Sequence, residues 1–151
     1  KKHIKPFAYV NLLGDSLHNF IDGIIIGTSY LISIPIGIAT TIAIIFHEIP
    51  QEIGDLGVLI HAGLSKKKAL LVNFITALTS LLGVILALAL TTIIDNLTLY
   101  LIPFAAGTFI YIASTDLIPE LHKEVKWEKS IIQTLLILLG IVLMLLLSFF
   151  N

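Results

Sequence analysis

Long runs of apolar residues, separated by short polar breaks, make up most of the chain. A helix needs about 20 mainly apolar residues to cross the hydrocarbon core of a bilayer. Five segments reach that length, at approximately residues 7–32, 36–60, 69–94, 99–118 and 130–150. Because such short connections suit only helices, the pattern predicts an all-α integral membrane protein, with a five-helix transmembrane bundle as its single domain.

The composition agrees with a lipid environment. Hydrophobic residues make up 57% of the sequence and charged residues 13%, whereas soluble domains carry roughly 25% charged residues. The absence of cysteine excludes disulfides and thiolate metal ligands. The formal net charge of −1 and the lack of a basic stripe exclude nucleic acid as an expected partner, so we expect contact with the lipid bilayer instead.

The lysines indicate how the chain lies in the membrane. All nine basic residues are lysines, and they fall in clusters at residues 1–5, 66–68 and 123–129. With five spans these clusters share one side, which the positive-inside rule makes the cytoplasmic side. We therefore expect a cytoplasmic N-terminus and an outer C-terminus at Asn151, in a multi-pass protein of the plasma membrane. Because the chain begins with Lys1 and not with methionine, we also expect further helices before it in the whole protein.

Ionisable residues concentrate in the first two apolar segments, where the bilayer disfavours them. A charged side chain at the centre of a spanning helix costs roughly 2.5–3.5 kcal/mol on insertion scales. These segments contain Asp15, His18, Asp22, His47, Glu48, Glu52 and Asp55, with Asn11, Asn19 and Gln51 among them. Such a density of costly groups indicates a functional site in which they are paired, hydrated or bound to a cation.

Helical spacing brings these residues together on two faces. Asp15, His18 and Asp22 recur at i, i+3 and i+7, so they share one face of the first helix. The short connection at residues 33–35 makes the first two helices antiparallel neighbours. It also places His18 and His47 at comparable depth, so the two polar faces are expected to meet near the middle of the membrane.

The second helix presents two polar rows. His47, Gln51 and Asp55 recur every four residues, and Glu48 and Glu52 form a neighbouring row about 100° away. Imidazole, carboxylate and amide ligands suit Zn²⁺, and also Fe²⁺, Mn²⁺, Co²⁺ or Cd²⁺. No organic cofactor and no covalent chemistry are implied. The alternative for any one His–Asp pair is a purely structural hydrogen bond.

Other polar residues are weaker candidates for metal ligands. Asp15, Glu52, Asp55 and Asn73 are interpreted as further metal or path positions. Asp116, Glu120 and His122 close the fourth segment on the predicted cytoplasmic side. They are interpreted first as an ordinary polar helix end and, as the alternative, as a metal exit site.

Two motifs resemble a known family. The segment 14–23 (GDSLHNFIDG) and the segment 47–55 (HEIPQEIGD) resemble the fourth and fifth membrane helices of ZIP (Zrt/Irt-like) metal transporters, in their LIV-1-like branch. The segment 104–113, followed by Asp116 and Pro119, is similar to the seventh helix of that family. The resemblance implies that the chain is the C-terminal portion of an eight-helix ZIP fold, helices four to eight.

The resemblance also implies a metal centre and an assembly. His18, Asp22, His47 and Gln51 would form a first site, and Asn19 and Glu48 would contribute to a second. Gln51 departs from the family, because the mammalian branch has histidine there and other branches have glutamate. Many members place a ligand on the sixth helix, where this chain offers only Asn73 or Ser80. Family members usually act as homodimers.

The leading hypothesis is a divalent metal transporter, most suited to zinc as its transported substrate, that moves metal toward the cytoplasm and is not an enzyme. One alternative is an intramembrane zinc metalloprotease, because His47-Glu48 begins an H-E-x-x-H-like motif in which Gln51 replaces the second histidine. Another alternative is a metal-sensing or assembly subunit of a membrane complex.

Overall fold

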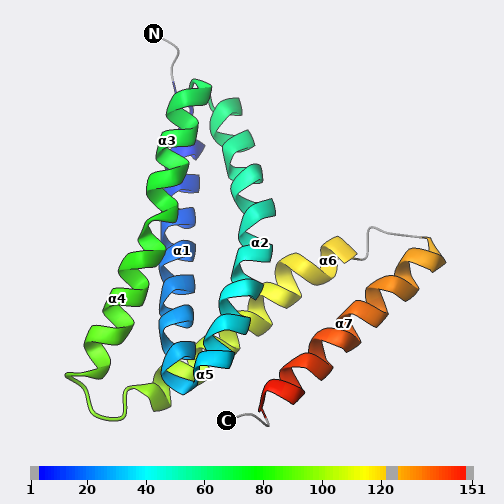
Figure 1. Ribbon diagram of the computed structural model, residues 1–151. Helices are drawn as coiled ribbons and strands as arrows, with labels where there is room; N and C mark the ends of the chain where they lie inside the picture. Colours follow the sequence, from blue (N-terminus) through cyan, green and yellow to red (C-terminus); the bar gives the residue numbers. More distant parts are fainter. Residues whose placement is uncertain (1–3, 122–125, 149–151) are drawn as a thin grey trace.

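The computed structural model describes residues 4–121 and 126–148, and every regular element in them is helical (Figure 1). The predicted all-α bundle is thereby confirmed. The elements are α1 (Phe7–Ile32), α2 (Ile34–His61), α3 (Lys66–Ala77), α4 (Thr79–Thr91), α5 (Thr98–Ile112), the π-helical turn η1 (Ala113–Leu117), α6 (Ile118–Leu121) and α7 (Trp127–Ser148).

A single residue separates α1 from α2. Ser33 adopts an extended conformation, with φ −165° and ψ 157°, and its hydroxyl accepts a hydrogen bond from the backbone N–H of Ile36. Pro35 fits the first turn of α2, where its missing N–H costs nothing, so α2 begins two residues before the segment predicted from residue 36. The two helices run antiparallel and side by side (Figure 1).

The third apolar segment forms two helices rather than one. Leu78 ends α3 and precedes α4. The hydroxyl of Thr79 lies 2.8 Å from the Ser16 carbonyl on α1 and 2.6 Å from the Thr76 carbonyl in its own segment. These contacts accompany the break, which the sequence did not predict because residues 69–94 contain no proline and no charged residue.

Glycines allow α1 and α4 to approach closely. A Cβ atom added at Gly23 would overlap the backbone carbonyl of Ser80, and one added at Gly83 would overlap that of Phe20. Gly27 faces Ala87, where an added Cβ would lie 3.1 Å from the alanine methyl. Backbone therefore meets backbone along this interface, as in membrane helix pairs with small residues at regular spacing.

The fourth and fifth segments also differ in their bounds from the prediction. Residues 99–118 were expected as one helix, whereas α5 passes into η1 at Ala113 and α6 follows. The last helix, α7, spans Trp127–Ser148 rather than 130–150. Among the described residues, Ile34–His61, Lys66–Thr91 and Thr98–Thr115 have the length and hydropathy of membrane spans. The five-span count and the orientation stay predictions.

Two small apolar cores lie at different levels of the bundle. Ala8, Leu59, Ala62 and Ala69 form one where α1 begins, α2 ends and α3 begins. Ile25, Ile44 and Ala105 form the other, between α1, α2 and α5. Between these two levels along α1 lie the polar residues that the sequence singled out.

Candidate metal centre

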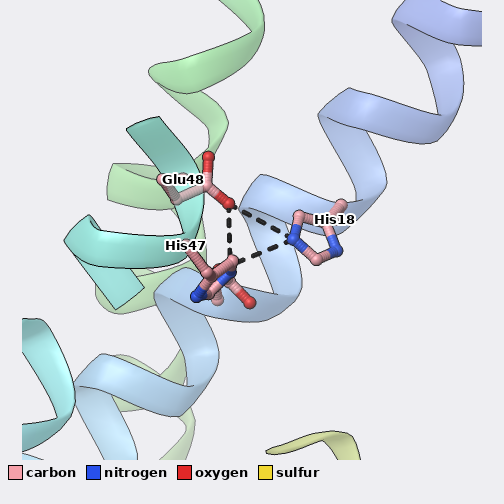
Figure 2. Close-up of side chains that lie close together, drawn as sticks. His18, His47 and Glu48 are labelled. Atoms are coloured by element: carbon pink, nitrogen blue, oxygen red, sulfur yellow. Dashed lines mark ion pairs between the residues drawn. The ribbon is translucent and has the colours of Figure 1, made fainter. Parts of the chain in front are cut away.

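Four of the predicted residues converge between α1 and α2. His18 on α1 faces His47 and Glu48 on α2 (Figure 2). Asp22, also on α1, is the fourth member. Each residue offers one ligand atom, and these atoms all lie within 4.8 Å of one another. We call these four residues the His–carboxylate group.

The shortest pairs in the His–carboxylate group cross from one helix to the other. His47 Nε2 lies 3.0 Å from Asp22 Oδ2, and His18 Nε2 lies 3.2 Å from Glu48 Oε1. The pairs within one helix are longer, at 3.8 Å for His18 and Asp22 and 3.4 Å for His47 and Glu48. Ligand atoms bound to one tetrahedral zinc ion lie roughly 3.3 Å apart. The separations are therefore close to those that a zinc site requires.

The ligand atoms are buried but lack directed hydrogen bonds. Asp22 is 1% exposed, and neither of its carboxylate oxygens has a hydrogen-bond partner among the described residues. The same holds for the Nε2 atoms of His18 and His47 and for Glu48 Oε1. Buried polar atoms without partners are costly. A cation placed among them would reduce that cost, because one ligand atom of each residue lies within 4.8 Å of the others.

The histidine rings are oriented in a way that suits metal binding. His18 and His47 meet edge to face, with ring centroids 5.6 Å apart and an interplanar angle of 82°. The Nδ1 atom of His47 faces the Ala43 carbonyl at 3.4 Å. A carbonyl at Nδ1 favours the tautomer that leaves the Nε2 lone pair for a metal.

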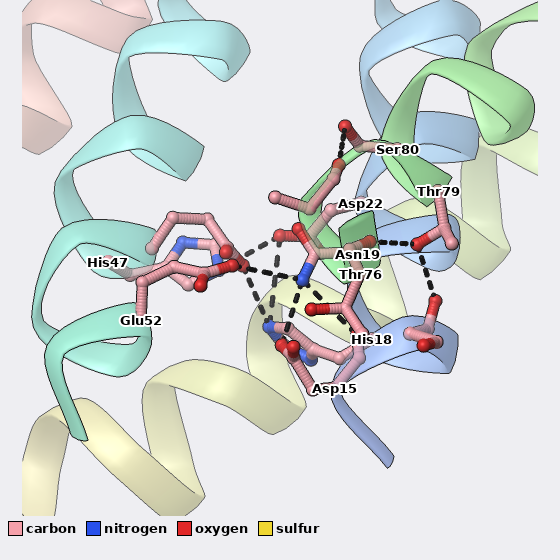
Figure 3. Close-up of polar contacts among 12 residues, drawn as sticks. Asp15, His18, Asn19, Asp22, His47, Glu52, Thr76, Thr79 and Ser80 are labelled. Carbon is pink, nitrogen blue, oxygen red and sulfur yellow. Dashed lines mark hydrogen bonds and ion pairs between the residues drawn. The ribbon is translucent and has the colours of Figure 1, made fainter. Parts of the chain in front are cut away.

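The structure places the other two first-ranked candidates differently. The amide nitrogen of Asn19 donates to the backbone and side chain of Asp15, at 3.2 and 2.9 Å, and to Glu52 Oε1 at 3.4 Å (Figure 3). Gln51 is half-buried, and its side chain has no hydrogen bond or ion pair with another described residue. Asn19 therefore lies with a neighbouring polar group, and Gln51 is not brought into the His–carboxylate group.

The lower-ranked residues on α1 and α2 lie one to two helical turns away. Asp55 accepts a hydrogen bond from Asn11 at 3.1 Å, which joins α1 to α2. Asn73 on α3 donates to the backbone carbonyl of Glu52 at 3.2 Å. These positions continue the polar face toward the start of α1. The exit residues of the sequence prediction lie outside the described part of the structure: His122 entirely, and Asp116 and Glu120 in their side chains.

Sequence reasoning named Asn73 and Ser80 on α3 and α4 but missed two threonines of the same segment. Thr76 and Thr79 follow Asn73 at intervals of three, so they return to the same side of the segment and face α1. That spacing was a signal available in the sequence. It was hidden because each hydroxyl also forms a hydrogen bond with a carbonyl of its own segment, as threonines in membrane helices often do.

An all-helical bundle of long apolar helices, with histidines and carboxylates facing each other across two of them, defines a class of protein, the polytopic membrane protein with a candidate metal site. A family model described as "ZIP Zinc transporter" matches residues 1–148. The chain therefore belongs to the ZIP zinc transporter family, which confirms the resemblance found in the sequence. This is a family of transporters and not of enzymes, so the protease alternative loses its support.

Several curated relatives carry zinc transporter names. The zinc transporter zipt-7.2 of Caenorhabditis elegans is 41% identical, and the match covers 100% of this chain and 34% of the relative. Zinc transporter ZIP13 of Danio rerio is 40% identical over 96% of this chain and 42% of its own length. Human zinc transporter ZIP6 is 34% identical over 98% and 20%, respectively. The chain thus spans less than half the length of these relatives. No solved structure matches it.

Proposed function

We propose that the chain forms the metal-carrying part of a transporter that moves zinc across a membrane toward the cytoplasm. The observation that carries the proposal is the convergence of two imidazoles and two carboxylates between α1 and α2. Nitrogen and oxygen ligands without thiolates suit Zn²⁺ and, with lower preference, Fe²⁺, Mn²⁺, Co²⁺ and Cd²⁺. Family membership supports zinc as the substrate.

Charge balance supports the binding of one divalent cation, and the ligand types support its release. Two neutral imidazoles and two carboxylates carry a formal charge of −2, which one Zn²⁺ ion neutralises. A neutral complex lowers the cost of burying charge within the bilayer. Zinc arrives hydrated, exchanges water for His18, His47 and the carboxylates, and displaces protons held by these groups. The lack of thiolate keeps binding weak enough for release.

The direction, the membrane and the assembly are parts of the same proposal. The lysine clusters support a cytoplasmic position for the start of α1, and the resemblance supports inward flux and a homodimer. Import from outside the cell would take place in the plasma membrane. The sensor alternative predicts metal binding with no flux, and the transport experiment below separates the two.

The test is uptake of radioactive Zn²⁺ into proteoliposomes that contain the full-length protein. His18→Ala and His47→Ala each remove one ligand, and we expect initial uptake to fall at least about tenfold in each. The matched control is His61→Ala, because His61 is exposed at the end of α2 and stacks on Phe7. Wild-type uptake in both ligand variants would refute the site, and zinc binding without any uptake would favour the sensor.

A further inference from the structure

One end of the bundle, where α1 and α3 begin and α2 ends, carries a dense positive charge (Figure 1, top). Lys5 precedes α1, and Lys66, Lys67 and Lys68 lie in the first turn of α3. The backbone N–H of Lys5 donates to the carbonyl of Ala62 at 3.0 Å, so Lys5 lies beside the connection from α2 to α3. All four lysines are exposed. We call them the lysine face.

The lysine face has no neutralising carboxylate beside it. None of the ion pairs found between described residues involves these lysines. Residues 1–14 and 56–94 contain no aspartate and no glutamate. Three of the four charges also lie in the first turn of a helix, where the helix dipole disfavours positive charge. The arrangement therefore costs free energy unless negatively charged groups approach from outside the chain.

The surface next to the lysines indicates which kind of anion fits. Leu70, Leu71 and Phe74 follow Lys67 at i+3, i+4 and i+7, so the four residues share one face of α3. The three apolar side chains are 55%, 58% and 62% exposed. A face with a cation at its end and exposed apolar groups along its length matches a phospholipid, which has a charged headgroup and apolar chains. A small free anion would contact the lysines alone.

The side chain of Lys5 is already ordered by aromatic neighbours. Its Nζ atom lies 5.8 Å from the centre of the Phe7 ring, and the ring of His61 stacks on Phe7 at a centroid distance of 6.3 Å. Phe7 is itself 40% exposed. An ordered lysine loses less side-chain entropy when it binds an anion. Aromatic rings beside lysines are also typical of the level where lipid headgroups lie.

We propose that the lysine face binds the headgroups of anionic phospholipids, whose chains lie along Leu70, Leu71 and Phe74. Charge complementarity carries the choice of partner, and the exposed apolar surface of α3 carries the choice of a lipid over a free anion. Anionic lipids are concentrated in the cytoplasmic leaflet, which is the side where the predicted orientation places these lysines. Lipid binding of this kind goes beyond zinc transport and does not depend on it.

A lipid bound at the first turn of α3 acts on the helix that supports α2. Ala69 packs against Leu59 in the apolar core at this end, directly after the three lysines. One turn further along α3, the side chain of Asn73 donates to the backbone carbonyl of Glu52 at 3.2 Å. These contacts join α3 to the second half of α2. Neutralising the charge of the first turn therefore stabilises the native packing of α3 on α2.

The experiment measures lipid binding by the purified full-length protein in detergent micelles. Fluorescent phosphatidylserine is the anionic probe, and phosphatidylcholine with the same chains and the same fluorophore is the probe without net charge. The test variant combines Lys66→Gln, Lys67→Gln and Lys68→Gln. The matched control combines Lys66→Arg, Lys67→Arg and Lys68→Arg, which keeps the charge. These positions are exposed, so both variants should fold, and cooperative thermal unfolding checks this.

We expect the wild type to bind phosphatidylserine at least about fivefold more tightly than phosphatidylcholine. The preference should weaken as salt is added, because the lysines are exposed. The glutamine variant should bind both lipids equally, and the arginine variant should keep the preference of the wild type. Phosphatidylserine should raise the midpoint of thermal unfolding of the wild type but not of the glutamine variant.

Three results would overturn the proposal. They are equal binding of both lipids by the wild type, an undiminished preference in the glutamine variant, and release of bound phosphatidylserine by an equal concentration of inorganic phosphate. The third would show a site for a free anion, because inorganic phosphate has no chains to contact α3. If the triple glutamine variant does not fold, Lys67→Gln alone replaces it, with an expected loss of at least about twofold in the preference. Zinc uptake that depends on His18 and His47 is a separate measurement, so the proposed function stands or fails independently.

Discussion

Helix α1 packs against α4 and α2 with two different kinds of surface. Toward α4 it presents Gly23 and Gly27, and the two backbones touch without intervening side chains. Toward α2 it presents Asp22 and His18, whose shortest contacts are with His47 and Glu48. One interface is held by shape and the other by charge, on the same helix and at nearly the same level.

The difference between the two interfaces indicates which of them can change when a metal ion binds or leaves. The α1–α4 contact depends on close backbone packing, which does not depend on whether a metal is bound. The α1–α2 contact brings two carboxylates and two imidazoles together, so its strength depends on protons and cations. We therefore expect α1 and α4 to behave as one rigid unit, and the α1–α2 interface to respond to zinc.

The largest expected effect comes from disrupting the rigid interface. Gly23→Ala places a methyl group on the Ser80 carbonyl, and because that neighbour is backbone, the helices must separate. We expect a loss of about 3 kcal/mol in the free energy of unfolding, with or without zinc. Denaturant titration of the purified protein measures it.

The matched control for this change is Gly14→Ala on the same helix. Nothing lies within 4 Å of a Cβ atom added at Gly14. Alanine is favoured over glycine inside a helix by about 1 kcal/mol, so this variant should be neutral or slightly more stable. Equal stability of Gly23→Ala and Gly14→Ala would show that α1 and α4 do not meet through their backbones.

The charged interface is tested by Asp22→Asn, which keeps the size of the side chain and removes its charge. Asp22 faces both histidines and is almost completely buried. We expect zinc affinity to fall about 100-fold, which corresponds to roughly 2.7 kcal/mol. Without zinc the stability should change little, because the amide avoids the cost of a buried charge. Thermal unfolding with and without Zn²⁺ measures both quantities.

Two outcomes would contradict this second expectation. In the first, Zn²⁺ stabilises Asp22→Asn as much as it stabilises the wild type. In the second, Asp22→Asn is less stable than the wild type by the same amount with Zn²⁺ and with a chelator. The first would remove Asp22 from the ligand set. The second would make the α1–α2 contact as independent of metal as the contact between α1 and α4.

The helix pair that carries the site was largely predictable from the sequence. Residues 7–32 coincide with α1, because an apolar run with polar residues on one face leaves few alternatives. The break at Leu78 was not predictable, since residues 69–94 contain no proline and no charged residue. There the hydroxyl of Thr79 contacts the Ser16 carbonyl of another helix. A contact between distant segments leaves no mark on local periodicity.

The candidate site was predicted only as far as helix faces allow. Periodicity puts His18 and Asp22 on one face, and the structure brings both to His47. Periodicity does not predict the direction in which an amide side chain points. Asn19 follows His18 directly, yet its amide turns back along the helix to Asp15, one turn earlier. Gln51 lies on the same face of α2 as His47. It is one turn further along the helix, so its side chain is not part of the His–carboxylate group.

The smallest expected effect comes from a substitution at Gln51, and it tests whether this position can bind zinc. Gln51→His adds an imidazole one turn after His47, where the LIV-1-like branch has histidine, and Gln51 has no competing contact among the described residues. We expect zinc affinity to rise about threefold to tenfold, by less than about 1.4 kcal/mol, because the new ligand must turn toward the group. Zinc uptake should saturate at lower concentration and reach a lower maximal rate, since tighter binding slows release. The matched control is Gln133→His on α7, which should leave both quantities unchanged. Unchanged affinity in Gln51→His would mean that the α1–α2 interface binds zinc through the His–carboxylate group alone.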